Sequence, residues 1–424
     1  MSLVEPAAAK PRMADYFSRL LVILRQPGFR WFWLGSSTQS VAQATQFLAI
    51  GWLVLEVTGS SAQLGLVIFL YGVPNVAFLI AAGVLADRFD RRYVLIITQA
   101  GVAGLIAALG ILTLVDAIVI WHVYSVAALL GVVQSLNMPA RMTMVSDLVD
   151  QASLLDAIAM QNAAVHAGRI AGPPIAGVII EVWGLSESLL AIAGCYVVSM
   201  ACVAKIGRTS QLMTVVSQSV FRNFAEGLSY IKNNPVVLTV IVITCSFGGF
   251  GMSHLQILPA MAKETLGAGA AGVGLLYLAS GIGSLIGNVF LPLLGTNNIY
   301  RSMLISVGLF VTFLIAFSWC DWFWLSWGLF LLVGSFGLGA VWPFSSTMVQ
   351  LESPSEVRGR VMGVLQFTPG FHFLGAFPLA LAAGVWSWGV AMTGAAAATA
   401  LVAVWFGVIR KGSPSLSGTA SDSK

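Results

Sequence analysis

Polar side chains recur at helical spacing within long apolar stretches of this sequence. Residues three or four apart lie on one face of a helix, so these side chains form three polar stripes: Gln39, Gln43 and Gln46; Gln134, Asn137 and Arg141; and Asn162, His166 and Arg169. Such groups are costly against lipid, and they should face a protein interior or a water-filled cavity. Hydrogen bonds between helices would satisfy any one stripe, but three stripes together favour a cavity that binds a polar solute.

Few groups in the apolar stretches could carry a proton. All 17 acidic residues fall in loops, tails or helix ends. Histidine titrates near neutral pH, so the candidates are Glu56, at the end of the first stretch, and His166, His254 and His372. A lone histidine can equally be a structural hydrogen-bond donor. Arg169 needs a counter-charge or carbonyl partners, and the sequence does not identify one.

A glycine-and-charge motif occupies residues 83–92, between the second and third apolar stretches. Gly83 allows two backbones to approach closely, and Asp87 can pair with an arginine or a helix N-terminus. Contacts of this kind can form in one conformation and break in another, which would make a latch. The alternative is a charged turn that only sets topology. The basic latch candidates are Arg88, Arg91, Arg92, Arg358 and Arg360.

A second motif combines glycine and proline. Gly168, Gly172 and Ala176 are spaced by four residues and give one smooth helix face. Pro173 and Pro174 remove backbone donors and bend a helix. A bent helix with a small-residue face suits a sliding contact, and a plain packing face is the alternative. Gly177 ends the motif.

Long apolar helices must position these motifs. Only 9% of the 424 residues are charged and 58% are hydrophobic, whereas soluble domains carry roughly 25% charged residues. Lipid must therefore be the main solvent. About 20 apolar residues span a bilayer as a helix, and barrel strands are about half as long. The sequence predicts an all-α membrane protein with about twelve spans: 31–55, 64–86, 93–114, 118–142, 156–180, 189–206, 235–260, 272–294, 302–319, 323–348, 359–384 and 387–409.

Basic residues predict the orientation, because Lys and Arg collect on the cytoplasmic side. They fall in the N-terminal tail and in every second connection, whereas the other connections hold only Lys263. Both termini are therefore predicted in the cytoplasm, in a multi-pass protein of the inner membrane. No cleavable signal peptide is expected. The net charge of +4 follows from this topology and does not indicate nucleic-acid binding.

The chain divides into two similar halves. Pro139 corresponds to Pro343, and Trp183 corresponds to Trp388, at an offset of about 205 residues. Parallel halves with a site at their interface are a known transporter architecture. The expected parts are a tail with an interfacial helix (1–30, helix at 14–26), two pseudo-symmetric six-helix bundles (31–206 and 235–410), a cytoplasmic linker (207–234) and a disordered tail (411–424).

Several motifs carry a family resemblance over nearly the whole chain. Residues 83–92 resemble the loop motif of the major facilitator superfamily. Residues 29–35, 51–60, 138–141 and 358–363 resemble the transmembrane secretion effector group, which includes exporters of siderophores and macrolides. The resemblance implies the major facilitator fold, in which spans one, four, seven and ten line the cavity. Span seven then contributes Thr244 and His254, and span ten contributes Trp342 and Ser346.

The glycine–proline motif also resembles the motif of antiporters in the same superfamily, with Ala176 in place of one glycine. The resemblance therefore favours secondary active efflux of small amphipathic molecules such as siderophores, antibiotics or drugs, by alternating access and proton antiport. An importer or a lysophospholipid flippase on the same fold, and a non-transporting scaffold or sensor, are the alternatives.

No metal-ligand spacing and no phosphate-binding lysine motif is found in the sequence, so neither an enzyme nor a cofactor is expected. The expected partners are a small-molecule substrate, protons and lipid, with no nucleic acid. The protein is expected to be a monomer.

The latch interpretation makes a direct prediction. Replacing Asp87 with Asn removes the charge that the latch needs, so we expect transport to slow while membrane insertion stays normal. Transport assays and quantification of the membrane-inserted protein measure the two effects. Wild-type transport in the variant would leave residues 83–92 as a topology signal alone.

Overall fold

A computed structural model describes residues 20–207, 220–290 and 298–409. It describes the backbone alone for residues 80–88, 220, 221, 223, 369, 408 and 409. Within these ranges the chain is helical and contains no β-strand. Of the predicted interfacial helix at 14–26, residues 20–25 are helical, and residues 14–19 lie outside the described ranges.

The N-terminal half contains six helices that are long and apolar enough to cross a membrane. Proline and glycine bound the first of them, because Pro27 starts the helix without an unmet donor and Gly59 ends it in the left-handed conformation, with φ of 63°. The six helices are α2 (Pro27–Thr58), α3 (Ser61–Arg88), α4 (Arg91–Leu114), α5 (Ile120–Leu148), α6 (Leu154–Val182) and α7 (Leu185–Ala204).

The C-terminal half begins with a short helix and continues with longer, interrupted ones. Its helices are α8 (Val220–Asn233), α9 (Pro235–Ser246), α10 (His254–Leu266), α11 (Ala270–Phe290), α12 (Ile299–Ser318), α13 (Phe323–Phe336), α14 (Trp342–Glu352), α15 (Ser355–Leu365), α16 (Phe371–Val385) and α17 (Trp388–Val404). Five spans are long and apolar enough to cross a membrane: 235–266, 270–290, 299–318, 323–352 and 388–407. With the N-terminal six, the described residues contain 11 such spans. The predicted span 359–384 is divided between α15 and α16, so the count of about twelve stays a prediction.

The C-terminal half contains three π-helical turns that the sequence did not predict, and one of them, Trp405–Ile409, follows α17. The other two are Phe247–Gly251, between α9 and α10, and Gly337–Val341, between α13 and α14. Both are glycine-rich and closely packed. A side chain at Gly248 would lie 2.6 Å from the Thr368 carbonyl oxygen, and one at Gly339 would lie 2.7 Å from the Ser284 carbonyl oxygen. The corresponding N-terminal helices, α2 and α5, have no such turn. The two halves therefore share a topology but differ in their backbones.

Helix α8 was also not predicted, because it lies in the polar connection 207–234. Its apolar face docks on the C-terminal half: the rings of Phe224 and Phe367 lie 5.1 Å apart, and the Tyr230 hydroxyl donates to the Glu352 carbonyl oxygen at 3.0 Å. Of the predicted linker, residues 208–219 lie outside the described ranges.

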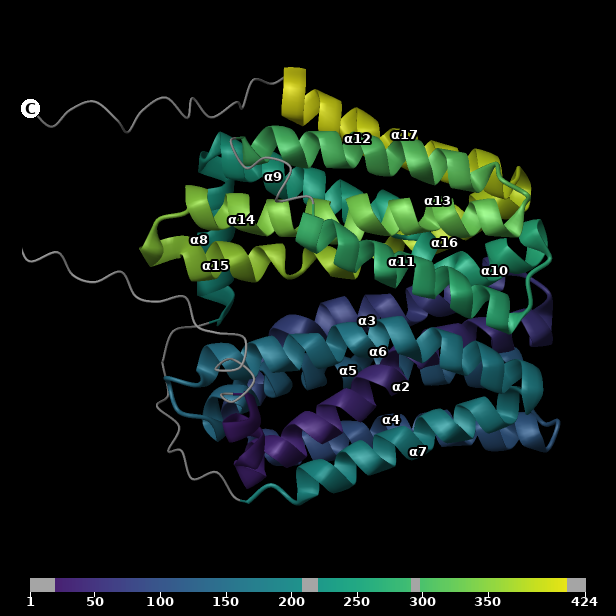
Figure 1. The fold of residues 1–424 in the computed structure, drawn as a ribbon, viewed down its shortest axis with the longest axis horizontal. Helices are drawn as coiled ribbons and strands as arrows, with labels where there is room; N and C mark the ends of the chain where they lie inside the picture. Colours follow the sequence, from purple (N-terminus) through teal and green to yellow (C-terminus); the bar gives the residue numbers. More distant parts are fainter. Residues whose placement is uncertain (1–19, 208–219, 291–297, 410–424) are drawn as a thin grey trace, which may run out of the picture.

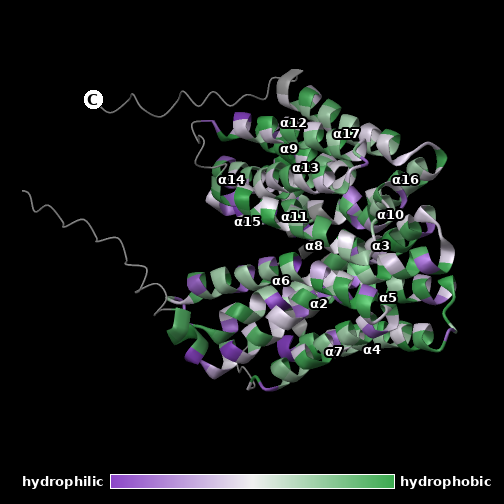
Figure 2. Ribbon diagram, turned by 45° about the vertical axis from the view of Figure 1, so that its right-hand side comes forward, coloured by the Kyte–Doolittle hydropathy of each residue, from purple (hydrophilic) through white to green (hydrophobic). Residues whose placement is uncertain are grey.

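The helices form two groups, with α2–α7 in one and α8–α17 in the other (Figure 1). We call the left-hand end in Figure 1, where α3 meets α4 and where α8 and α15 lie, the basic end, because Arg91, Arg92 and Arg360 lie there. The opposite end is the far end. Hydrophobic residues dominate the helices along most of their length (Figure 2), as the low charge content requires.

The two groups meet in the half of the molecule away from the basic end. The main contacts join α6 to α11 and α3 to α16. Gly274 is held so close that a side chain there would lie 2.7 Å from the Pro173 carbonyl oxygen, and one at Gly65 would lie 2.6 Å from the Ala380 Cβ. By contrast, the principal contacts of α5 and of α14 are all with helices of their own group. The groups are therefore joined mainly away from the basic end, where a smaller contact between α3 and α8 remains.

Glycine contacts also hold each group together, and one of them gives a prediction. A side chain at Gly283 in α11 would clash with the Leu331 carbonyl oxygen in α13, whereas one at Gly308 in α12 would meet no atom within 4 Å. Overpacking a close contact costs roughly 1–3 kcal/mol. We therefore expect Gly283→Ala to lower the melting temperature in detergent and the matched variant Gly308→Ala to leave it unchanged or raised. Equal melting temperatures would contradict the packing argument.

Candidate functional site

Two of the predicted polar stripes meet inside the N-terminal group. The Gln39 Nε2 in α2 donates to the Asn137 Oδ1 in α5 at 2.6 Å. The Asn137 Nδ2 donates to the Thr98 Oγ1 in α4 at 3.1 Å, and the Gln99 Nε2 donates to the Gln39 Oε1 at 3.1 Å. All four side chains are buried. This first amide cluster ties α2, α4 and α5 together.

A second amide cluster lies farther from the basic end and centres on Gln134. Its Oε1 accepts from the Gln43 Nε2 at 2.9 Å and from the Tyr71 hydroxyl at 3.3 Å. Its Nε2 donates to the Gln46 Oε1 at 3.2 Å, and the same oxygen accepts from the Tyr196 hydroxyl at 3.1 Å. Helices α2, α3, α5 and α7 are joined in this way. In this conformation the amides therefore bond mainly to one another, and Gln43 is only half-buried.

An aromatic cluster links the second amide cluster to the C-terminal group. The Phe373 ring in α16 lies 5.7 Å from the Phe47 ring and 4.9 Å from the Tyr71 ring, and Tyr71 also bonds to Gln134. The predicted proton carrier His372 stacks on Phe373, with ring centroids 4.0 Å apart. This cluster of Phe47, Tyr71 and Phe373 lies between the two groups.

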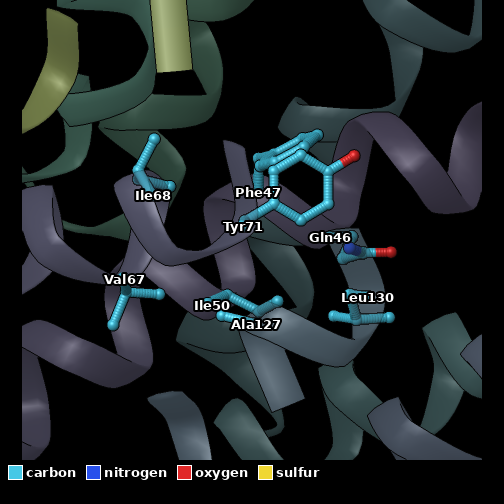
Figure 3. A pocket seen from close by; sticks show the side chains of 8 residues that line it. All are labelled: Gln46, Phe47, Ile50, Val67, Ile68, Tyr71, Ala127 and Leu130. Atoms are coloured by element: carbon cyan, nitrogen blue, oxygen red, sulfur yellow. The ribbon is translucent and has the colours of Figure 1, made fainter. Parts of the chain in front are cut away.

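A small pocket adjoins the aromatic cluster inside the N-terminal group. In Figure 3 the rings of Phe47 and Tyr71 lie side by side next to Gln46. The remaining lining is aliphatic, so the pocket is apolar apart from its Gln46 and Tyr71 edge. The lining residues are Gln46, Phe47, Ile50, Val67, Ile68, Tyr71, Ala127 and Leu130.

The third polar stripe and Arg141 form a basic face. His166 and Arg169 in α6 are exposed, and Arg141 in α5 is half-buried. His166 and Arg169 lie one turn apart on α6, and the positive charge of Arg169 disfavours the charged forms of His166 and Arg141. α5 has no principal contact with the C-terminal group, whereas α6 packs on α11 next to Arg169, where a side chain at Gly281 would lie 2.7 Å from the Ile170 Cγ1. Lipid is a poor environment for a guanidinium, so this face is best suited to water or to a polar solute.

The predicted C-terminal candidates have two different environments. Thr244 is buried and bonds to the Ser345 hydroxyl at 2.9 Å. His254 is also buried, between the Phe310 and Phe330 rings, and its Nδ1 lies 2.6 Å from the Gly251 carbonyl oxygen. Trp342 and Ser346 are half-buried. The structure therefore places Thr244 and His254 inside the C-terminal group and the other two nearer its surface.

The glycine–proline motif of α6 packs on both groups. A side chain at Gly168 would lie 2.7 Å from the Ser40 carbonyl carbon, and one at Gly172 would lie 2.9 Å from the Val41 carbonyl oxygen, so both glycines pack on α2. Gly177 instead contacts the Ala270 backbone of α11, and Pro173 contacts Gly274 of α11. One helix therefore carries the packing of its own group and part of the contact between groups.

The predicted latch residues at the basic end pair within each group in this conformation. Arg91 forms an ion pair with Asp147 of α5, and Arg92 donates to the Ala204 carbonyl oxygen. Arg360 pairs with Glu226 of α8 at 2.7 Å, and Arg358 donates to the Ser353 carbonyl oxygen at 3.1 Å. The side chains of Gly83, Asp87 and Arg88 lie outside the described part of the chain.

Polar contacts between the groups lie at the far end. The Lys263 ammonium of α10 lies 5.1 Å from the centroid of the Trp52 ring in α2, and the Trp52 indole donates to Glu56 at 2.8 Å. Glu181 at the end of α6 accepts from the Ala271 backbone N–H at 3.2 Å, where an anion is favourable at the start of α11. Sequence reasoning singled out Glu56 but missed Trp52, Lys263 and Glu181 as a group, since only their convergence reveals it.

Comparison with known proteins decides the family. The family profile described as "Transmembrane secretion effector" matches residues 19–412. The chain belongs to this family of the major facilitator superfamily. It is therefore a multi-pass membrane protein of a transporter family and not of an enzyme family, and the predicted family is confirmed.

Relatives of this secretion effector are named as transporters. It is 23% identical over 346 residues to the staphyloferrin A transporter of Staphylococcus aureus, covering 80% of this chain and 85% of that protein. It is 26% identical over 365 residues to the multidrug efflux pump Tap of Mycolicibacterium fortuitum, covering 82% and 88%. It is 25% identical over 372 residues to the enterobactin exporter EntS of Escherichia coli, covering 82% and 83%.

A solved structure supports the fold. The structure of the nucleoside transporter NupG superposes with a TM-score of 0.73 over 90% of this chain and 99% of that chain, at 14% identity. At this identity the match concerns the fold alone. The predicted all-α, major facilitator fold class is confirmed, while the number of spans and the side on which the termini lie stay predictions.

The far-end contact of this secretion effector gives a prediction. A cation–π contact at an exposed site contributes about 0.5–1 kcal/mol, and the contact between Lys263 and Trp52 exists only while the far end is closed. We expect Lys263→Gln to shift the balance between far-end-closed and far-end-open molecules about two- to fivefold toward open.

Distances between spin labels at the far ends of α2 and α11, in a protein without its four native cysteines, measure this balance. The matched control is Lys232→Gln, because Lys232 lies in α8 at the basic end. A distance distribution that does not change in Lys263→Gln would mean that the contact does not hold the far end closed.

Proposed function

We propose that this secretion effector is a secondary active exporter of small amphipathic molecules in the bacterial inner membrane, and that it works as a monomer by alternating access. The observation that carries the proposal is the contact pattern between the groups: α6–α11 and α3–α16 join them near the far end, while α5 and α14 do not bridge them. With both termini in the cytoplasm, this is the conformation that admits cargo from inside the cell.

In the proposed cycle, residues 31–206 and 235–410 act as two bodies that rock about the glycine contacts of α6 and α11. Small residues let helices pack at close range, and at Gly177 and Gly274 the backbones of α6 and α11 approach each other closely. Residues 207–234 link the two bodies. Arg91, Arg92, Arg358 and Arg360 at the basic end would exchange their present partners when that end closes, together with Gly83, Asp87 and Arg88.

The proposed cargo class comes from the relatives and from the chemistry of the faces. Relatives are named for siderophore, drug and macrolide transport. In this chain, an amphipathic molecule would meet the basic face of Arg141 and Arg169 on one side and the aromatic ring of Phe373 on the other. Gln39, Gln43, Gln46, Gln134, Asn137, Thr244, His254, Trp342 and Ser346 are retained as cavity candidates for other steps of the cycle.

The proposed driving force is proton antiport. Among the described residues, no carboxylate lies in the middle of a span. The proton carrier would therefore be Glu56 at the far end, or His166 or His372 nearer the centre. The charge of Arg169 acts on His166. The α6 motif Gly168, Gly172, Pro173 and Gly177, which resembles that of antiporters, also favours export over import.

Everted membrane vesicles that overproduce the protein test this function. We expect labelled apo-siderophore or macrolide to accumulate when the vesicle interior is acidified, and the accumulation to be lost when an ionophore collapses the pH gradient. Vesicles without the protein are the control. Accumulation that ignores the gradient would exclude proton antiport, and accumulation only in right-side-out vesicles would indicate an importer. Movement of labelled lysophospholipid alone would indicate a flippase, and no movement of any compound would favour a scaffold or sensor.

A further inference from the structure

Two arginines in the spans have no acidic partner among the described residues. The three ion pairs that the described residues form join Arg91 to Asp147, and Arg222 and Arg360 to Glu226. Arg141 and Arg169 take part in none of them, and neither guanidinium is hydrogen-bonded to a described residue. The charge of Arg169 also disfavours the charge on Arg141. Charges without a partner are costly in a membrane protein, so the packing of α5 and α6 must hold both guanidinium groups in place.

The position of this pair matches the path that cargo would take. Gly168 packs directly on Ser40 of α2, which sets Arg169 about two turns nearer the basic end than Phe47. Arg141 lies one turn nearer that end than Asn137, which bonds to Gln39 of α2. A molecule that enters from the basic end therefore meets Arg141, then Arg169, and then the aromatic cluster of Phe47, Tyr71 and Phe373.

The order of the side chains along this path, two arginines and then aromatic rings, favours one kind of ligand. A guanidinium presents a planar fork of donors that matches a carboxylate or another oxyanion. One anionic group between Arg141 and Arg169 would remove their mutual repulsion and satisfy their donors. An aromatic body attached to that group could then stack on Phe47 or Phe373. A cationic molecule would be repelled by the same pair.

We propose that Arg141 and Arg169 form an anion subsite, so that this protein selects amphipathic molecules with a carboxylate or similar acidic group on an aromatic body, and not cations. The inference rests on the proposed exporter function and narrows its cargo by charge. It also separates this chain from a pump for cationic drugs, although the fold and family are compatible with either.

Binding of three matched probes to the purified full-length protein tests the proposal. The probes are naphthalene-2-carboxylate, the neutral naphthalene-2-carboxamide and the cationic naphthalen-2-ylmethylammonium, measured by calorimetry in a neutral detergent. Wild type should bind the carboxylate most tightly and the ammonium most weakly. Hydrogen bonds to charged groups contribute about 1.5–3 kcal/mol, so Arg141→Gln or Arg169→Gln should weaken carboxylate binding about ten- to hundredfold and leave carboxamide binding within about twofold.

Arg301→Gln is the matched control, because Arg301 is an exposed arginine of α12 at the basic end and should have no effect. Arg141→Lys and Arg169→Lys keep the positive charge, so they should preserve the order of the three probes. If a Gln variant fails to fold, the order of probe binding by the Lys variants tests the proposal in its place. Equal binding of carboxylate and carboxamide by wild type, equal loss of both probes in the Gln variants, or no binding of any probe would overturn the proposal.

Lipid is the other source of an anionic group. Nanodiscs of phosphatidylcholine with and without phosphatidylglycerol separate the two sources, because loss of carboxylate binding only with phosphatidylglycerol would assign the subsite to a lipid headgroup and overturn the assignment to cargo. Unchanged carboxylate binding in both would support it. The vesicle assay stays independent: gradient-driven export without any charge preference among the probes would remove this inference and leave the exporter function standing.

Discussion

A side-chain amide inside a bilayer has no water to bond to, so it must find its partners within the protein. The N-terminal group meets this constraint with two clusters. Gln39, Asn137, Gln99 and Thr98 bond to one another, and Gln134 bonds to Gln43, Gln46 and Tyr71. Interhelical hydrogen bonds in membranes are worth only about 0.6 kcal/mol each on average. Their main effect is to define which helix faces meet, and this makes the N-terminal group one body that can move as a unit.

The C-terminal group solves the same packing problem in another way. Its helices are joined by separate hydrogen bonds, such as those of Thr244 with Ser345 and of Tyr300 with the Gly407 carbonyl oxygen. It also has close backbone contacts at glycines, aromatic pairs such as Phe317 with Phe330, and three π-helical turns. Such turns are frequent at functional sites. The two halves therefore share a topology, but amide clusters join the helices of one, and close backbone and ring contacts join those of the other.

The junction between the groups combines features of both. Phe373 of the C-terminal group packs on Tyr71, whose hydroxyl bonds to the amide cluster of the N-terminal group. Around it, glycines of α3, α6 and α11 bring backbones into contact. The junction is therefore built from close backbone contacts and ring contacts. The basic ends carry the ion pairs within each group, and there the principal contact between the groups is the smaller one of α3 with α8.

Composition and pattern determined much about this protein without coordinates. A chain with so few charges must use lipid as solvent, the lengths of its apolar runs exclude barrel strands, and the motif at residues 83–92 already indicated the superfamily. The polar stripes on α2 and α5 were also visible, because helical periodicity places Gln39, Gln43 and Gln46 on one face.

Other features depended on the tertiary structure alone. Periodicity gives the face of a helix but not what lies opposite. Only the fold could decide that most of the amides bond to each other and that His254 lies between two phenylalanine rings. Likewise, Trp52 and Lys263 are separated by more than two hundred residues, and no local pattern could pair them. The sequence decides which solvent each segment prefers, because transfer free energy is a local property, whereas contacts between distant side chains are set by how the helices pack.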